Sequence, residues 1–317
     1  MILVTGANGF VGRELCAELA RRDYKVCGSV RHFSHASGLS CEIAVTGDIG
    51  PSVDWAKALR TVDSVVHLAA RVHLLRETAS DPLSVFRMTN TGGATNLAKQ
   101  AARAGVSRFV YISSIKVNGE QTLPNQPFTE QDVPAPLDPY GISKYEAEEE
   151  LRNLAQQTGM EVVIIRPPLV YGPGVRANFL NMMSWLHKGV PLPFGAINNC
   201  RSLIALDNLV DLIITCLEHP AAANQVFLAS DGRDLSTTEL LRQMAKALNM
   251  PVRLLPIPHK FLEVGFKMVG KVDLAQRLCG SLQVDITKAC IMLGWKPLIS
   301  VDEGLHRTAE FFLRSRG

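Results

Sequence analysis

Short apolar runs alternate with longer segments of helical periodicity over the first half of the chain. Runs such as ILVT at the start and SVVHLAA near residue 64 are each followed by a stretch whose apolar positions recur every three or four residues. Those helical stretches cover 11–22, 85–104 and 140–158. The alternation predicts an α/β fold with a Rossmann-like, doubly wound parallel sheet. Because the crossovers of such sheets are right-handed, the carboxyl ends of the strands share one edge, where ligands bind.

Beyond Arg166 the pattern changes, because proline and glycine become frequent and interrupt the periodicity. We expect residues 1–166 to form a dinucleotide-binding Rossmann domain, which residues 203–230 rejoin. Residues 167–202 and 231–317 are then expected to form a smaller C-terminal substrate-binding domain, or lid.

Two segments of the predicted lid have recognisable patterns. Ser236 is followed three residues later by Glu239, which is typical of a capping box that opens a helix. The stretch from Phe261 to Val269 is largely apolar, and we expect it to be a helix packed on the core rather than a segment that touches a membrane surface.

A glycine-rich turn follows the first predicted strand. Gly6, Gly9 and Gly12 are spaced so that the chain turns tightly and the next helix begins with its amide groups facing outward. Such a helix N-terminus binds phosphate groups, because its N–H groups and its dipole both favour negative charge. Although glycines also mark plain turns, the preceding strand and the following helix favour a pyrophosphate site.

The end of the second strand indicates which dinucleotide is bound. Arg31 stands where an acidic residue would hold the adenosine ribose of NAD. Together with Arg13, its guanidinium matches the geometry and charge of a 2′-phosphate. NADP(H) is therefore favoured, NAD(H) remains possible, and the alternative is that both arginines are merely solvated.

Tyr140 and Lys144 lie four residues apart and therefore share one face of a predicted helix. A tyrosine with a pKa near 10 is a poor acid–base group at neutral pH unless a neighbouring cation stabilises its phenolate, which a lysine one turn away supplies. Ser114, at the end of the preceding strand, is placed to hydrogen-bond the same substrate oxygen. These three side chains are the predicted catalytic residues.

Composition excludes several other classes of protein. The net charge is +3, and no basic run is interleaved with aromatic residues, so we expect no nucleic-acid partner. The seven cysteines are scattered without a CxxC pair, and no metal site is predicted. No apolar run reaches the roughly 18 residues of a membrane span, and we expect a cytoplasmic protein.

The motifs TGANGFVG, HLAA, YISSIKVNG, DPYGISK and RPPLVYGPG resemble those of the extended short-chain dehydrogenases, the family of NAD-dependent nucleotide-sugar epimerases, dehydratases and reductases. The resemblance covers nearly the whole chain. It implies a homodimer and a UDP-sugar substrate. The cofactor-binding residues that we assign are Gly6, Gly9, Phe10, Val11, Gly12, Arg13, Arg31, Asp48, Ile49, Leu68, Ala69, Ala70, Tyr140, Lys144 and Pro167. The assigned substrate-binding residues are His73, Lys116, Asn178 and Arg201, of which Lys116 could instead be simply exposed and Asn178 a loop cap. His67 is expected to be a buried, hydrogen-bonded strand residue.

The residues after Ser114 bear on the reaction. The family's 4,6-dehydratases carry an Asp–Glu pair there, whereas this chain has Ile115 and Lys116. Dehydration is therefore disfavoured. Arg31 favours an NADPH-dependent reductase that acts on the C4 ketone of a UDP-4-keto-6-deoxy-hexosamine in O-antigen or surface polysaccharide biosynthesis. The alternative is a UDP-glucose or UDP-N-acetylglucosamine 4-epimerase that retains NAD. A third reading, an NADP-binding redox sensor, gives no reason to keep the Ser, Tyr and Lys set.

Overall fold

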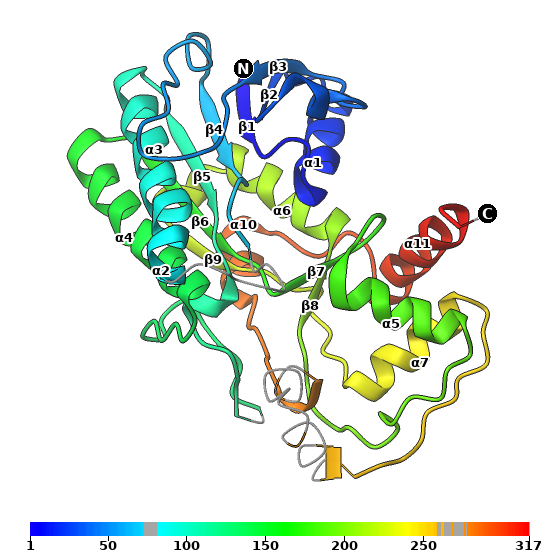
Figure 1. The fold of residues 1–317 in the computed structure, drawn as a ribbon. Helices are drawn as coiled ribbons and strands as arrows, with labels where there is room; N and C mark the ends of the chain where they lie inside the picture. Colours follow the sequence, from blue (N-terminus) through cyan, green and yellow to red (C-terminus); the bar gives the residue numbers. More distant parts are fainter. Residues whose placement is uncertain are drawn as a thin grey trace.

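A seven-stranded parallel sheet forms the larger lobe of the computed structural model, which describes residues 1–72, 81–123, 125–258, 261–262, 268, 276 and 278–316 (Figure 1). The strand order is β3-β2-β1-β4-β5-β6-β9. The strands are β1 (Ile2–Thr5), β2 (Val26–Val30), β3 (Glu42–Val45), β4 (Ser64–His67), β5 (Arg108–Ile112), β6 (Glu161–Arg166) and β9 (Val226–Leu228). The order reverses direction between β1 and β4, so the carboxyl edge there is the point at which such sheets bind ligands.

Helices cover both faces of the sheet, because neighbouring residues of a strand point to opposite sides. Leu3 of β1 packs with α3 (Gly93–Arg103) and α4 (Pro139–Thr158) on one face. The next residue, Val4, packs with α1 (Phe10–Arg21), α6 (Leu206–Glu218) and α10 (Thr287–Leu293) on the other. The chain enters α3 through α2 (Pro82–Phe86) and a π-helical segment, η2 (Arg87–Gly92). The predicted helix 85–104 is thus a composite of three pieces.

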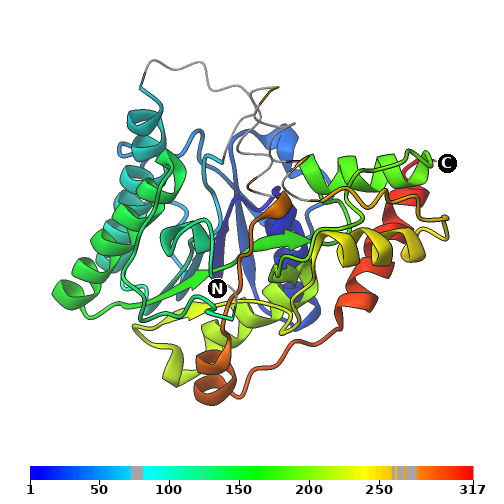
Figure 2. The ribbon, with the colours of Figure 1, turned by 90° about the horizontal axis from the view of Figure 1, so that it is seen from below.

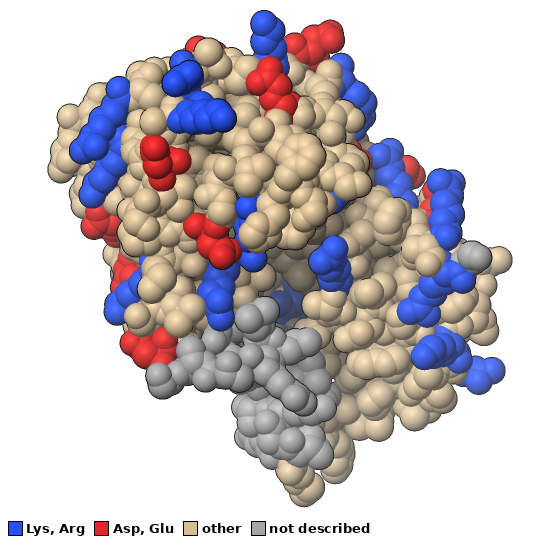
Figure 3. Space-filling model, turned by 45° about the horizontal axis from the view of Figure 1, so that its top comes forward, with Lys and Arg blue, Asp and Glu red and all other residues tan. Residues whose placement is uncertain are grey.

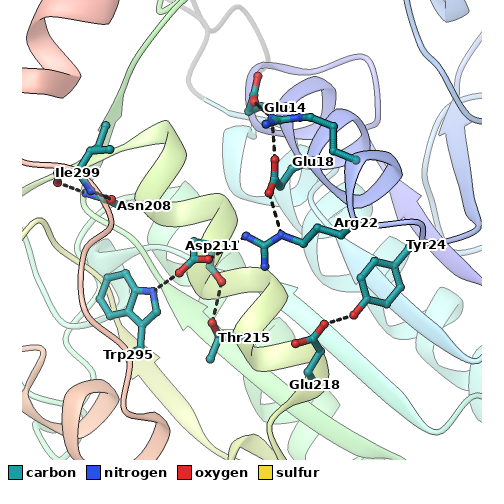
Figure 4. Close-up of polar contacts among 11 residues, drawn as sticks. Glu14, Glu18, Arg22, Tyr24, Asn208, Asp211, Thr215, Glu218, Trp295 and Ile299 are labelled. Carbon is teal, nitrogen blue, oxygen red and sulfur yellow. Dashed lines mark hydrogen bonds and ion pairs between the residues drawn. The ribbon is translucent and has the colours of Figure 1, made fainter.

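Polar contacts fasten α1 to α6 at the solvent edge (Figure 4). Arg22, at the end of α1, donates to Glu18 of the same helix and, at 3.0 Å, to Asp211 of α6. The indole N–H of Trp295 donates to the other oxygen of Asp211, also at 3.0 Å. Asp211 therefore joins three segments that are far apart in the sequence.

The second lobe holds a two-stranded parallel sheet, β7 (Leu169–Tyr171) with β8 (Leu203–Ala205), and a group of helices. Figure 2 shows these helices together beside the main sheet, as the green, yellow and red coils on the right. They are α5 (Ala177–His187), α7 (Thr237–Ala247) and α11 (Val301–Arg314). They share one apolar core, and the predicted capping box is present, since Ser236 and Glu239 exchange hydrogen bonds.

The open edge of the main sheet, at β9, is occupied by side chains. The backbone N–H of Leu228 donates to Glu130 at 3.0 Å, and Lys288 donates to the carbonyl of Val226 at 2.9 Å. Those outward-facing backbone groups are therefore satisfied by charged side chains rather than by another strand.

Most of the stretch from Phe261 to Val269 lies outside the described residues. Of those that are described, Leu262 is buried in the core of the second lobe, whereas Phe261 and Met268 are 71% and 81% exposed. Within 231–317, α10 and Trp295 pack in the core around α1. In the part of the chain that the structure describes, no helix is both long and apolar enough to cross a membrane.

Candidate active site

The glycine turn between β1 and α1 has no room for side chains. Gly6 adopts a φ of +67°, and a Cβ atom there would lie 3.0 Å from the backbone nitrogen of Ala69. A Cβ atom on Gly12 would lie 2.2 Å from the carbonyl oxygen of Gly6. The turn is closed by a hydrogen bond from the Gly9 N–H to that same carbonyl. The result is a bare backbone cradle at the N-terminus of α1, as pyrophosphate binding requires.

A cleft of about 730 Å³ extends from this turn along the carboxyl edge of the sheet. That volume is typical of a small-molecule or cofactor site. Of the predicted cofactor residues it is lined by Gly6, Gly9, Arg31, Asp48, Ile49, Leu68, Ala69 and Ala70. Residues that the sequence did not single out complete it, among them Asn8, Ser29, Thr46, Arg71, Met88 and Thr89. Figure 3 shows a hollow on one face of the molecule with basic side chains at its rim.

The two arginines assigned to a 2′-phosphate both have partners within the protein. Arg31 forms an ion pair with Asp48, with 3.2 Å between Nε and Oδ1. Arg13 donates to the backbone carbonyls of Asn8 and Ser37 at 3.2 and 2.9 Å. The charge of Arg31 is therefore partly balanced by a carboxylate of the protein.

The predicted catalytic residues converge at the start of α4. Asp138 caps this helix by accepting a hydrogen bond of 2.7 Å from the Gly141 N–H, and Pro139 fixes the first helical residue. Tyr140 lies in the first turn and is hydrogen-bonded to Ser114. One turn further, the Lys144 ammonium lies 6.0 Å from the centre of the Tyr140 ring and donates to the Ile112 carbonyl at 2.8 Å. The structure thus brings Ser114, Tyr140 and Lys144 together.

Burial shifts the two titrating groups toward their neutral forms. It raises the pKa of Tyr140 to about 12, which the hydrogen bond from Ser114 opposes. It lowers the pKa of Lys144 to about 7, which the negative charge of Glu148 opposes. Near neutral pH the group that loses its proton is therefore Lys144, while Tyr140 keeps its phenol proton. For Tyr140 to act as a base, a positive charge beside it, such as that of a protonated Lys144, has to lower its pKa.

His67 and Asn90 support the site without reaching it. His67 is fully buried, and its Nδ1 atom forms a 2.8 Å hydrogen bond with the Thr5 hydroxyl, as expected of a strand histidine. Asn90 is also buried, donates to the Ser143 hydroxyl at 3.0 Å and accepts from the Arg71 N–H at 2.8 Å. Asn90 thereby joins the loop after β4 to α4, the helix that carries Tyr140 and Lys144. Its place in the NTGG stretch could have suggested this role.

The predicted substrate residues occupy four different settings. Lys116 forms ion pairs with Asp138 and Glu120, so its ammonium is already engaged. Asn178 is exposed on the first turn of α5. Arg201 is partly buried and donates to the Gly280 carbonyl at 3.0 Å. His73 lies outside the described residues.

Pro167 is buried, and its carbonyl accepts a hydrogen bond of 3.0 Å from the N–H of Ile115, the residue after Ser114.

With the glycine cradle, the cleft and the Ser, Tyr and Lys set, the fold and site define an enzyme that binds a dinucleotide. The residues present fit such a cofactor, because a side chain on Gly12 would collide with the turn and the cleft begins there. The chain belongs to the NAD dependent epimerase/dehydratase family, whose model matches residues 2–229.

Curated relatives and solved structures agree with this assignment. The chain is 50% identical over 317 residues to a UDP-glucose 4-epimerase of Vibrio cholerae, covering 99% of this chain and 96% of the relative. It is 28% identical to an N-acetyl-α-D-glucosaminyl-diphospho-ditrans,octacis-undecaprenol 4-epimerase of Escherichia coli O157:H7, covering 98% and 94%. Its fold matches a Bacillus cereus UDP-glucuronic acid 4-epimerase in complex with NAD, with a TM-score of 0.80, 22% identity and coverage of 99% and 96%.

Proposed function

We propose that this protein is a UDP-hexose 4-epimerase that interconverts UDP-glucose and its C4 epimer with tightly held NAD. The observation that carries the proposal is the joint presence of the Tyr140–Lys144 pair with Ser114 and 50% identity over almost the full chain to a UDP-glucose 4-epimerase. The pairing of Arg31 with Asp48 supports NAD rather than NADP as the cofactor.

The residues supply the acid–base part of such a reaction. Bound NAD would accept the hydride from C4 of the sugar and return it to the opposite face of the ring. Tyr140, as phenolate, takes the proton of the 4-hydroxyl group, and Ser114 shares that oxygen through its hydroxyl. Lys144 holds the phenolate by its positive charge. After the 4-keto sugar has rotated to present its opposite face, Tyr140 returns the proton to O4.

One acid–base tyrosine suffices for these reaction steps, because the proton leaves and returns at the same oxygen, O4. A 4-keto-reductase would use the same three side chains with external NADPH, so the cofactor separates the two reactions. The sequence favoured the reductase through Arg31, whereas the ion pair with Asp48 and the curated relatives favour the epimerase.

The test is to purify the protein and incubate it with UDP-glucose without added cofactor. The expected result is a mixture with UDP-galactose, observed by proton NMR of the anomeric region, and NAD released on denaturation. Tyr140→Phe serves as the inactive control. Consumption of one NADPH per molecule of a UDP-4-keto-6-deoxy-hexosamine, with no interconversion of UDP-hexoses, would refute the epimerase.

A second candidate substrate is a polyprenyl-diphosphate-linked sugar at a membrane surface. The lid favours it, because Val252, Leu255, Phe261 and Met268 are all exposed apolar side chains. Segments 177–206 and 240–262 contain Lys and Arg residues but no Asp or Glu. Segments 190–195 and 252–257 are joined by backbone hydrogen bonds between Leu192 and residues 253 and 255. Exposed apolar side chains of this kind favour contact with a lipid surface.

The two substrates are separated by presenting each to the same preparation. Epimerisation of undecaprenyl-diphospho-N-acetylglucosamine in anionic vesicles, without conversion of UDP-linked sugars, would favour the lipid-linked substrate. Conversion of UDP-glucose in solution, with no binding to vesicles of phosphatidylglycerol, would exclude it.

A further inference from the structure

Two fully buried charges lie behind the catalytic helix. Glu148 of α4 and Arg166 at the end of β6 are 0% and 1% exposed. They form a bidentate pair, with 2.9 Å from Nε to Oε1 and 2.5 Å from Nη2 to Oε2. Removing two ions from water costs several kcal/mol, which their attraction offsets only when the geometry is good and further hydrogen bonds are present. The other partners of the pair therefore indicate what it does.

Those partners lie on both sides of Ser114. The Ser113 hydroxyl donates to Glu148 Oε1 at 2.5 Å. On the far side, Arg166 Nη1 donates at 2.9 Å to the side-chain oxygen of Asn118, which ends the short helix η3 (Ile115–Val117). The backbone that carries Ser114 is thus fixed at both ends by one ion pair.

The same pair bears on two further parts of the site. Arg166 directly precedes Pro167, whose carbonyl accepts the Ile115 N–H. Glu148 follows Lys144 by one helical turn, and its negative charge raises the pKa of that lysine against the effect of burial. The groups that face Lys144 are Tyr140 and Glu148 from its own helix, Tyr111 from β5 and His67 from β4, and among these Glu148 alone is a carboxylic acid.

We propose that Glu148 and Arg166 are positioning residues of the reaction. They hold the Ser114 loop and Pro167 in place against Tyr140, and the charge of Glu148 keeps Lys144 protonated. This inference rests on the proposed acid–base role of Tyr140 and Lys144, but not on the identity of the sugar.

The first test is the pH dependence of kcat. In Glu148→Gln the side chain keeps its shape and loses its charge, so Lys144 loses its proton at lower pH and the descending limb of the profile is expected to move about one pH unit lower. At neutral pH, kcat should fall about fivefold while KM changes less than about twofold, because the substrate is not touched. Glu148→Asp retains the charge and should keep the limb at the wild-type pH.

Arg152→Gln is the matched control. Arg152 also donates to Glu148, at 3.2 Å, but its side chain is 37% exposed and it contacts no part of the Ser114 loop among the described hydrogen bonds. We expect its kcat and its pH profile to match the wild type.

The second test needs no turnover. The titration of the Lys144 ammonium is followed by heteronuclear NMR in the wild type and in Glu148→Gln, with the signal assigned through Lys144→Met. A lower pKa in Glu148→Gln supports the proposal even if no UDP-hexose is converted. If Glu148→Gln does not fold, the double variant Glu148→Gln/Arg166→Met, which removes both charges, is measured instead. Loss of thermal stability with unchanged Lys144 titration and unchanged kcat would show a purely structural pair and overturn the proposal.

Discussion

Lys144 donates a hydrogen bond to the backbone carbonyl of Ile112, 2.8 Å away. Ile112 ends strand β5, two residues before Ser114, so the lysine is fixed to the strand that delivers the serine. This contact sets the height of the ammonium along α4. It also leaves the ammonium 4.5 Å from the centre of the Tyr111 ring and 6.0 Å from the centre of the Tyr140 ring.

Removing the phenol oxygen should abolish most of the turnover. Tyr140→Phe keeps the ring in contact with Phe86 and is expected to lower kcat by roughly 100-fold or more, with NAD content unchanged. Lys144→Met should lower both kcat and NAD affinity. Epimerase assays and the NAD content after denaturation check both variants, and wild-type kcat in Tyr140→Phe would contradict the assignment.

The Arg31–Asp48 pair predicts how cofactor preference can be changed. Asp48→Asn removes the charge that balances Arg31, so the affinity for NADP should rise by about tenfold, or about 1.4 kcal/mol, relative to NAD. Titration calorimetry measures both cofactors. In the double variant Asp48→Asn/Arg31→Gln the gain should disappear; its persistence would show that Arg31 does not contact the phosphate.

Buried His67 should make the protein sensitive to acid. Burial, together with the charge of Lys144, lowers the pKa of His67 to about 3 from its ordinary 6.5. Below pH 6.5, His67 binds a proton in the unfolded chain but stays neutral in the folded chain, so the free energy of unfolding falls as the pH decreases from 6.5 toward 3. At pH 5 the loss is about 2 kcal/mol.

Urea unfolding at pH 7.5 and pH 5 measures this loss. His67→Gln, which retains an oxygen to accept from Thr5, should lose about 2 kcal/mol less than the wild type between the two pH values. Equal losses in both proteins would place the acid-sensitive group elsewhere.

A methyl group at Gly12 should damage the cofactor cradle. Its Cβ atom would lie 2.2 Å from the Gly6 carbonyl, so Gly12→Ala is expected to cost about 1–3 kcal/mol of stability and to release NAD. Gly50→Ala is the matched control, because a Cβ atom at that position would meet nothing within 4 Å. Differential scanning fluorimetry and NAD content measure both; a normal NAD content in Gly12→Ala would disprove the cradle.

Local patterns sufficed to predict the sheet and to predict that Ser114, Tyr140 and Lys144 would lie together. The glycine turn, the helix that begins before Tyr140 and the strand before Ser114 each depend on neighbours in the sequence, so their spacing is visible without a structure. The division of helix 85–104 into three pieces was not predictable in this way, because its π-helical segment depends on packing against α4.

Ion pairs between residues far apart in the sequence could not be predicted. Arg31 and Asp48 are both exposed and lie 17 residues apart, so no sequence pattern indicates that they form an ion pair. The sequence therefore could not show that Arg31 already has a partner in the protein. Likewise, the ion pair of Lys116 with the helix-capping Asp138 could be recognised only in three dimensions.

The charged side chains at β9 have a consequence for the protein in concentrated solution. An edge strand with free N–H and C=O groups can accept a strand from another molecule and start an ordered aggregate. Glu130 and Lys288 occupy the Leu228 N–H and the Val226 carbonyl, so an incoming strand would first have to displace both. The sheet thus ends at β9, and these two contacts oppose polymerisation through this edge.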